Sequence, residues 1–152
     1  MDTRMNIKQA ALSDLSTIKK ISEVTVSEIY PHYYPKGAVE YFLAHHNEAN
    51  IIKDIKENQV FLCFDLKRNV VGTVTIRENE ICRLFVLPSR QGNGYGTELL
   101  DHAEKIISHQ YSKIILSSSL PAKNYINTDV YSNSRDLKLS RLFIFCESTI
   151  CN

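Results

Sequence analysis

Three of the five glycines of the chain, Gly92, Gly94 and Gly96, occupy alternate positions within one short stretch. They follow the apolar run 84–86 and precede an amphipathic segment, so the pattern predicts a strand, a tight turn and a helix. Because glycine adopts backbone conformations closed to other residues, successive amide N–H groups can converge at the positive end of the helix. The chemistry that this arrangement predicts is the binding of a phosphate or pyrophosphate.

Two common phosphate-binding motifs do not fit the spacing. The dinucleotide-binding motif G-x-G-x-x-G would need glycine at position 97 or 99, where the chain has Thr97 and Leu99. The P-loop needs a Gly-Lys pair, and none occurs in the sequence. The glycine run therefore belongs to another kind of phosphate-binding loop.

The arrangement Gln91-x-x-Gly94-x-Gly96, directly after the predicted strand, resembles the acetyl-CoA signature of the GNAT family of N-acetyltransferases. In that family the exposed main chain of the strand pairs with the pantetheine arm, and the loop amides bind the pyrophosphate. The resemblance implies acetyl-CoA as the cofactor. The implied binding residues are Leu84, Phe85 and Val86 on the strand, and Gln91, Gly92, Asn93, Gly94, Tyr95, Gly96 and Thr97 in the loop. The alternative is a glycine turn that only tightens the connection.

Acetyl transfer to an amine needs a general base, because most amines are protonated at neutral pH. The resemblance implies Glu80, which lies about where GNAT members often carry a catalytic glutamate. A solvated charge at the end of a hairpin explains this glutamate equally well. His32, His45 and His46 are further candidates for the base, with ordinary surface positions as the alternative.

The resemblance also implies a tyrosine as the general acid that protonates the leaving thiolate. The segment 119–131 begins like the family pattern, and Tyr125 is the candidate, with Tyr131 behind it. Tyr125 comes one residue early, and no glycine follows Gly96, so the expected turn after the tyrosine is absent. Simple packing or exposure is the alternative role for both tyrosines.

The elements that must position these residues follow from the apolar periodicity. Strands are expected at 6–9, 60–64, 70–76, 81–86, 113–118 and 139–145, and helices from Ser13–Asp14 to Tyr30, at 38–44, at 48–57 and from the glycine loop to about 109. This order resembles the GNAT fold over about residues 5–120. The expected fold is α/β (α+β): a mixed, mostly antiparallel sheet flanked by helices, with parallel strands that splay apart at the cofactor.

The residues after 120 depart from the family pattern, which has two closing strands where this chain offers one. Three interpretations stay open: a divergent but functional ending, a strand exchanged in a homodimer, or an end changed by a coding alteration. The acceptor pocket of the family is formed by the first interhelical loop, here 30–36, and by the C-terminal strands. Aromatic residues in and near that loop, Tyr30, Tyr33, Tyr34 and Tyr41, suit a small amine by stacking or serve plain packing.

Length and composition are those of one domain of 152 residues with 18 basic and 17 acidic residues. This charge balance offers no footprint for nucleic acid or an anionic membrane. No apolar run has the length of a membrane span, and the first residues lack the apolar core of a signal peptide, so a cytoplasmic location is expected. The four cysteines form no C-x-x-C pair, and no disulfide or metal site is expected.

Two functions from different classes are consistent with the sequence. The first is an N-acetyltransferase that transfers the acetyl group of acetyl-CoA to a small-molecule or peptide amine, by direct attack in a ternary complex. The second is a non-catalytic acyl-CoA-binding module whose C-terminal acceptor site has degenerated. The intact glycine loop supports both functions. They differ in whether the altered end of the chain still forms a working acceptor site.

Overall fold

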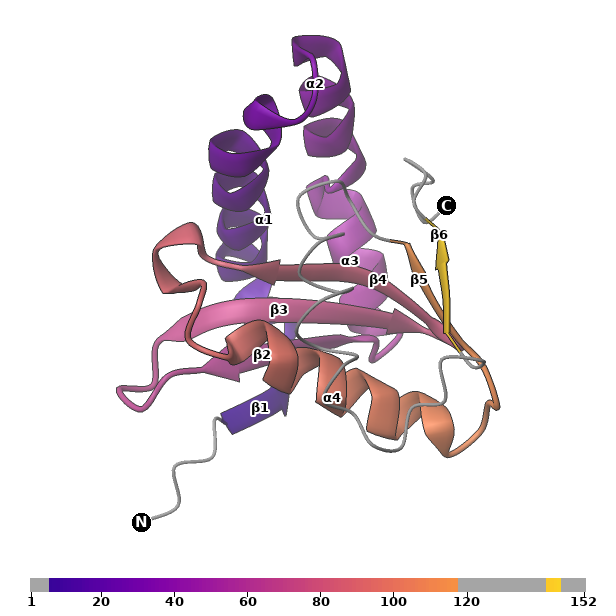
Figure 1. Cartoon of the computed structure of the whole chain (residues 1–152). Coiled ribbons are helices and arrows are strands. Elements are labelled where there is room, and N and C mark those ends of the chain that lie inside the picture. Colours follow the sequence, from indigo (N-terminus) through magenta and orange to yellow (C-terminus); the bar gives the residue numbers. More distant parts are fainter. Residues whose placement is uncertain (1–5, 118–141, 146–152) are drawn as a thin grey trace.

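The structure is a computed structural model that describes residues 6–117 and 142–145. Six strands form one sheet in the order β1-β2-β3-β4-β5-β6, with helices on both faces (Figure 1). The strands are β1 Asn6–Gln9, β2 Val60–Phe64, β3 Val70–Arg77, β4 Glu80–Val86, β5 Ile114–Ser117 and β6 Leu142–Phe145. The helices are α1 Leu15–Ile29, α2 Lys36–His45, α3 Glu48–Lys56 and α4 Tyr95–Ser108, with short 3-10 turns at Leu12–Asp14, Tyr30–His32 and Pro88–Arg90.

The first four strands are antiparallel, and β4, β5 and β6 run parallel to one another. The fold class expected from the sequence is therefore confirmed. The β2–β3 turn is fixed by Asp65, whose Oδ1 accepts hydrogen bonds from the N–H groups of Lys67 and Asn69 at 2.9 and 2.8 Å. Such side-chain bonds to the backbone favour a turn over a continuous strand.

Helices α1 and α3 begin differently from one another. The side chain of Asn47 caps α3 by accepting the N–H of Asn50 at 2.9 Å. Asp14 is the residue before α1, as the sequence predicts, but its carboxylate accepts the N–H of Ala11 at 2.8 Å instead of capping α1. The Asp14 carboxylate therefore serves the preceding 3-10 turn and makes no side-chain cap for α1.

The core has one layer on each face of the sheet. Helix α4 presents Leu99, Leu100, Ala103 and Ile107 to a layer that includes Val74. On the other face, α1 and α3 bury Ile18, Ile51 and Ile55 against β2 residues Val60 and Leu62. Burial of a side chain of this size contributes about 1.5–3 kcal/mol each. Among the described residues, no helix combines the length and apolar character needed to cross a membrane.

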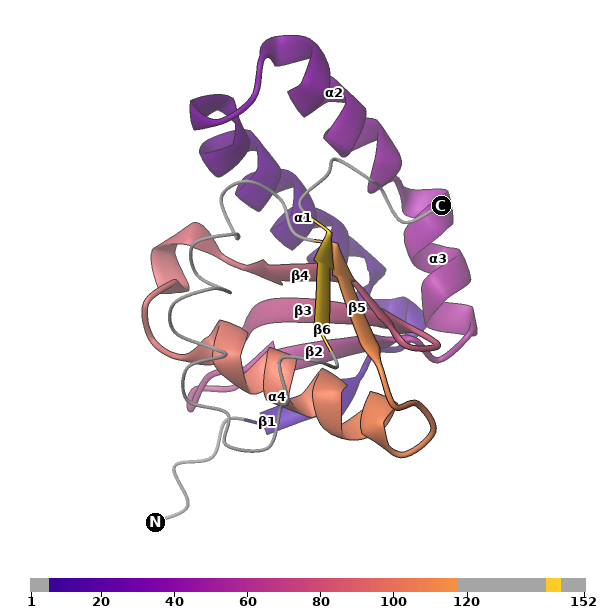
Figure 2. The same ribbon diagram turned by 45° about the vertical axis from the view of Figure 1, so that its right-hand side comes forward.

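Strands β4 and β5 pair only where they begin. The paired residues are Glu80 with Ile115 and Ile81 with Leu116. Figure 2 shows β5 running away from β4 beyond this point, with β6 beside β5. The predicted splaying of the two parallel strands is confirmed. The closing strand expected at 139–145 is present as β6, and it pairs with β5 of the same chain.

Candidate active site

The central feature of the site is the edge of β4 that faces β5. On its other edge, β4 pairs with β3 along its length except at Cys82, including Val74 with Leu84 and Gly72 with Val86. Within the described residues, no strand pairs with the β5-facing edge after Ile81. Backbone groups left unpaired on a strand can bind an extended ligand. The main chain of Leu84, Phe85 and Val86, predicted to bind pantetheine, lies on this edge.

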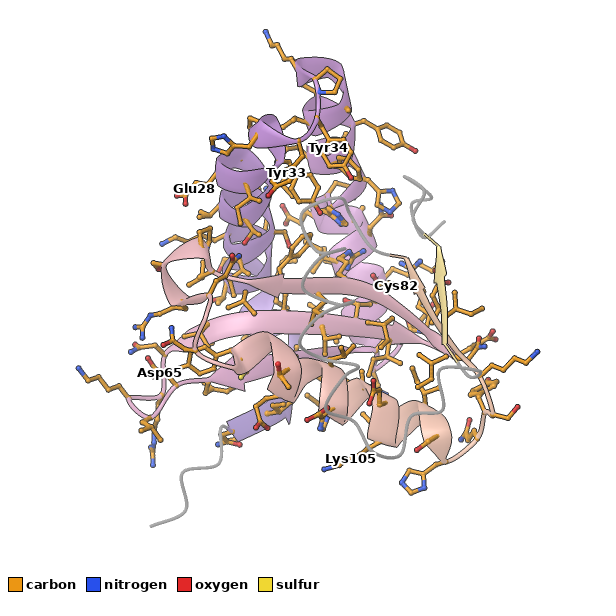
Figure 3. All side chains as sticks on the ribbon, in the orientation of Figure 1. Glu28, Tyr33, Tyr34, Asp65, Cys82 and Lys105 are labelled. Atoms are coloured by element: carbon orange, nitrogen blue, oxygen red, sulfur yellow. The ribbon has the colours of Figure 1, made fainter. Side chains whose placement is uncertain are left out.

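A β-bulge at Cys82 accounts for the separation of the two strands. Thr75 pairs with Arg83 and Ile76 with Ile81, so Cys82 is an extra residue in β4. The bulge directly follows the last pair between β4 and β5, and Figure 3 places Cys82 beside both strands. Bulges bend a strand and increase its twist. No signal in the sequence indicates this bulge, because it depends on the register of the neighbouring strand.

The glycine loop takes the backbone conformation expected at two of its three glycines. Gly92 has φ 81° and Gly94 has φ 88°, in the left-handed region that favours glycine. Gly96 lies in the first turn of α4 and does not share this conformation. The expectation of a left-handed conformation is therefore wrong for Gly96, because α4 begins one residue before it.

Side chains of the loop hold its backbone in place. The amide nitrogen Nε2 of Gln91 donates to the carbonyl oxygen of Val86 at 3.0 Å, which ties the loop to the end of β4. Asn93 donates to the carbonyl oxygen of Arg90 at 2.9 Å, and Arg90 pairs with Asp65 of the β2–β3 turn at 3.3 Å. These bonds constrain the loop backbone from within the chain itself, and such a constraint lowers the ordering cost of binding.

The N-terminus of α4 is suited to an anion. The N–H of Glu98 donates to the carbonyl oxygen of Gly94 at 3.1 Å, which is the first hydrogen bond at the N-terminus of α4. The amides of Tyr95, Gly96 and Thr97 precede it, at the positive end of the helix dipole. Gly94 has no side chain with which to cap the helix. This is the geometry in which helix termini bind phosphate groups.

Close packing of α4 on the sheet depends on Gly72, a residue that the sequence analysis did not single out. A Cβ at Gly72 would lie 2.9 Å from Cδ1 of Leu99 and 2.9 Å from the carbonyl oxygen of Phe85. Helix α4 and the main chain of β4 therefore both approach this point. A glycine inside a strand pattern is the signal that could have indicated such an approach.

Of the predicted catalytic residues, the structure describes Glu80 but not the two candidate tyrosines. Glu80 is half-buried at the start of β4, where the strand still pairs with β5. It lies about 14 Å along the strand from Leu84, at about 3.4 Å per residue. Tyr125 and Tyr131 lie outside the described residues, so their role as the acid stays a prediction. The structure therefore locates Glu80 at the start of β4, and its role as the base stays a prediction as well.

His46 differs from the surface residue expected from the sequence. It is 9% exposed, and its Nδ1 accepts a hydrogen bond from Nε of Arg83 at 3.1 Å. Burial, with the nearby Arg83 and His45 charges, lowers the pKa of His46 to about 3. An imidazole with this pKa is a poor proton acceptor at neutral pH. Its ring lies against that of Phe85, with centroids 5.1 Å apart.

The aromatic loop between α1 and α2 combines packing with exposed rings. Tyr30 is buried, and its ring contacts those of Tyr34 and Phe42 at centroid distances of 5.4 and 4.9 Å. Tyr33 and Tyr41 are exposed. Figure 3 shows Tyr33 and Tyr34 at the connection of α1 and α2. Tyr30 therefore serves packing, whereas Tyr33 and Tyr41 present aromatic surface to solvent.

The two described cysteines are both free thiols. Cys63 is buried, and burial together with the Glu98 carboxylate raises its pKa to about 11. This thiol is inert at neutral pH. Cys82, by contrast, is only half-buried. In the part of the chain that the structure describes, no three His, Cys, Asp or Glu side chains gather in a way that could hold a metal ion.

A mixed sheet opened at a bulge, beside a glycine loop and a helix N-terminus, defines an acetyltransferase-type α/β domain. The model of the family described as "Acetyltransferase (GNAT) domain" matches residues 29–128. This match covers more than half of the chain, and the chain therefore belongs to the GNAT acetyltransferase family.

Individual relatives are distant in sequence. An N-alpha-acetyltransferase of Sulfolobus acidocaldarius is 26% identical, and the alignment covers 88% of this chain and 81% of the relative. A GCN5-related N-acetyltransferase structure from Rhodopseudomonas palustris has a TM-score of 0.74 at 19% identity, covering 84% of this chain and 81% of that chain. The PaiA N-acetyltransferase of Thermoplasma acidophilum, in complex with coenzyme A, has a TM-score of 0.59 at 20% identity, covering 70% and 74%. These two structures share the fold with this chain.

Proposed function

We propose that this chain is an acetyl-CoA-dependent N-acetyltransferase that acts on a primary amine of a small molecule or peptide. The observation that carries the proposal is the β4 edge, opened by the bulge at Cys82 and ending beside the N-terminus of α4. Membership of the GNAT family supports it. The coenzyme A complex of the Thermoplasma acidophilum neighbour supports the choice of cofactor.

The pantetheine arm and the pyrophosphate of acetyl-CoA each have a place in this proposal. The pantetheine arm pairs with the main chain of Leu84–Val86 and completes the backbone bonds of that edge. The pyrophosphate binds at the loop, which takes its shape from Gly92 and Gly94, and at the first amides of α4. The pyrophosphate carries negative charge toward the positive end of the helix dipole. No metal ion is needed for either contact.

The reaction is a direct attack of the amine nitrogen on the thioester carbonyl carbon. A carbon–nitrogen bond forms, an oxyanion develops, and the carbon–sulfur bond breaks to release the thiolate. In the proposal, Glu80 takes the amine proton, directly or through water, and Tyr125 gives a proton to the thiolate. Backbone N–H groups on the β4 edge stabilise the oxyanion, a contact of about 2.7–4 kcal/mol in enzymes where it has been removed.

The acceptor is proposed to bind between the aromatic loop and the β4 edge. Tyr33, just before α2, and Tyr41, within α2, offer exposed rings. Rings of this kind suit an amine by stacking or cation–π contact. The relative from Sulfolobus acidocaldarius is named for N-alpha acetylation, so peptide α-amines are the first acceptors to test.

Titration calorimetry with acetyl-CoA, followed by a thiol-release assay on amines and peptides, tests the proposal. We expect binding and turnover for the natural chain. Glu80→Gln should lower kcat at least tenfold with little change in the Kd of acetyl-CoA, because the glutamate moves a proton and does not hold the cofactor. Tyr125→Phe should do the same. Binding without turnover would favour the non-catalytic acyl-CoA-binding module, and no binding would overturn the assignment of the glycine loop.

A further inference from the structure

A charged cluster is buried on the face of the sheet that α1 and α3 cover. Asp54 of α3 is 0% exposed and Arg83 of β4 is 3% exposed. Nη2 of Arg83 lies 2.6 Å from Oδ2 of Asp54. Nη2 of Arg77, on β3, donates to Oδ1 and Oδ2 of the same carboxylate at 2.8 and 3.0 Å. One carboxylate therefore binds arginines from two adjacent strands.

The two arginines lie on opposite sides of the bulge. Arg77 pairs with Glu80, two residues before Cys82, and Arg83 is the first residue after it. The carboxylate of Asp54 thus holds the paired strands on both sides of the extra residue. A bulge leaves one residue outside the ladder, so its position depends on contacts beyond the backbone.

Arg83 has few other contacts that could keep it in place. Its Nε donates to Nδ1 of His46 at 3.1 Å. Its Nη1 is buried and has no hydrogen-bond partner among residues 6–117 and 142–145. Charged groups that are withdrawn from water need such partners, since an unpaired buried charge is strongly unfavourable. Without Asp54, His46 alone would hold this guanidinium.

We infer that Asp54 is a positioning residue for acetyl transfer, acting through Arg77 and Arg83 on the bulge at Cys82. By fixing Arg83 it fixes the course of β4 over 82–86, the edge on which the proposed thioester and oxyanion contacts lie. The inference rests on the proposed function, but its structural part concerns the backbone and can be measured without turnover. The side-chain bonds that the structure gives Asp54 go to β3 and β4, and α3 and α4 belong to different core clusters, so we expect the cofactor's phosphate site to stay intact when Asp54 is changed.

The test compares Asp54→Asn with the natural chain at a temperature where both are folded. The amide keeps the size of the side chain but loses the charge that binds both arginines. We expect kcat to fall at least tenfold while the Kd of acetyl-CoA rises no more than threefold. Hydrogen exchange measured on peptides covering 82–86 should become at least tenfold faster, with no change in peptides from α4.

Two further variants separate positioning from a general loss of stability. Ile18→Ala removes a buried side chain from a cluster that contains no β4 residue, and it serves as the control for a general loss of stability. This control should leave kcat and the exchange over 82–86 within twofold of the natural chain. Arg83→Lys keeps the charge but cannot bond Asp54 and His46 together, so it should lower kcat three- to tenfold. It also provides the test if Asp54→Asn does not fold.

The possible outcomes are distinct. Equal kcat and equal exchange in the Asp54 or Arg83 variant and the natural chain would overturn the inference. The same losses in Ile18→Ala would overturn it as well, because they would then follow stability alone. If the natural chain binds acetyl-CoA but transfers nothing, the proposed function fails, and faster exchange over 82–86 would still establish that Asp54 positions the bulge.

Discussion

At the scale of single residues, burial determines what His46 can do. A histidine at the end of a helix is a natural candidate for a base, but here its Nδ1 accepts from Arg83 and its ring contacts Phe85. The proton of the neutral ring is therefore on Nε2. Because the charged form would lie beside a guanidinium in a water-poor site, His46 contributes to stability in its neutral form.

A pH dependence of stability follows from His46. Its pKa is about 3 in the folded chain and near 6.5 when unfolded, so the unfolded state binds the proton more readily. The stability that the neutral His46 ring provides is fully present above pH 6.5. It is lost as the pH falls toward 3, where the free energy of unfolding decreases by about 1.4 kcal/mol per pH unit. Urea unfolding at pH 7, 6 and 5 measures it. We expect His46→Gln to reduce the slope of the free energy of unfolding against pH, and the exposed His32→Gln to leave that slope unchanged. Equal slopes in the natural chain and in both variants would contradict the assignment of this pH dependence to His46.

Gly94 is the residue on which the proposed cofactor site depends most directly. With φ 88°, an alanine at this position would cost about 1–2 kcal/mol in backbone energy, so the loop would shift to avoid it. We expect Gly94→Ala to weaken acetyl-CoA binding at least tenfold, measured by calorimetry. Gly37→Ala is the control, since a Cβ there meets nothing within 4 Å. Unchanged affinity in Gly94→Ala would contradict the role of the loop.

At the scale of elements, the sequence predicts most of the helices and strands that the structure describes. The strand predicted at 60–64 matches β2, and the one at 81–86 lies within β4, because apolar residues there follow a strand pattern bounded by turn residues. The charged cluster could not be predicted in this way. Asp54, Arg77 and Arg83 look like solvated charges in the sequence, and only the packing of α3 on the sheet brings them together.

The packing of α4 on the sheet leaves no room for a side chain at Gly72. A methyl group there would overlap both Leu99 and the Phe85 carbonyl oxygen, so α4 or β4 must move. We expect Gly72→Ala to lower the free energy of unfolding by about 1–3 kcal/mol, as other overpacked cores do. Because both elements border the proposed cofactor site, the affinity for acetyl-CoA should fall as well. Stability and affinity equal to those of the natural chain would show that the packing adapts without moving either element.

At the scale of the whole molecule, the sheet is incomplete between β4 and β5, and a bound ligand can supply backbone hydrogen bonds there. Strands β4 and β5 share only two residue pairs, and the edge beyond them has no strand partner within the described residues. The sequence indicates this opening only through the resemblance to the GNAT family. No local pattern shows that two parallel strands pair at one end and separate at the other, because the separation depends on the bulge in β4, which is set by the register of β4 with β3.

Ligand binding at this opening should stabilise the folded chain as a whole. A ligand that binds only the folded state at one hundred times its Kd adds about 2.7 kcal/mol. For a chain of this size that corresponds to a rise in melting temperature of about 5–10 °C. Thermal unfolding with and without acetyl-CoA measures this rise, and Gly94→Ala at the same ligand concentration should show at most half of it. Adenosine alone, which lacks pyrophosphate and pantetheine, should give almost none. An equal rise in melting temperature in Gly94→Ala would mean that acetyl-CoA binds elsewhere on the molecule. The reason is that the glycine loop lies between the β4 edge and the first turn of α4, and neither can hold the cofactor well once that loop has moved.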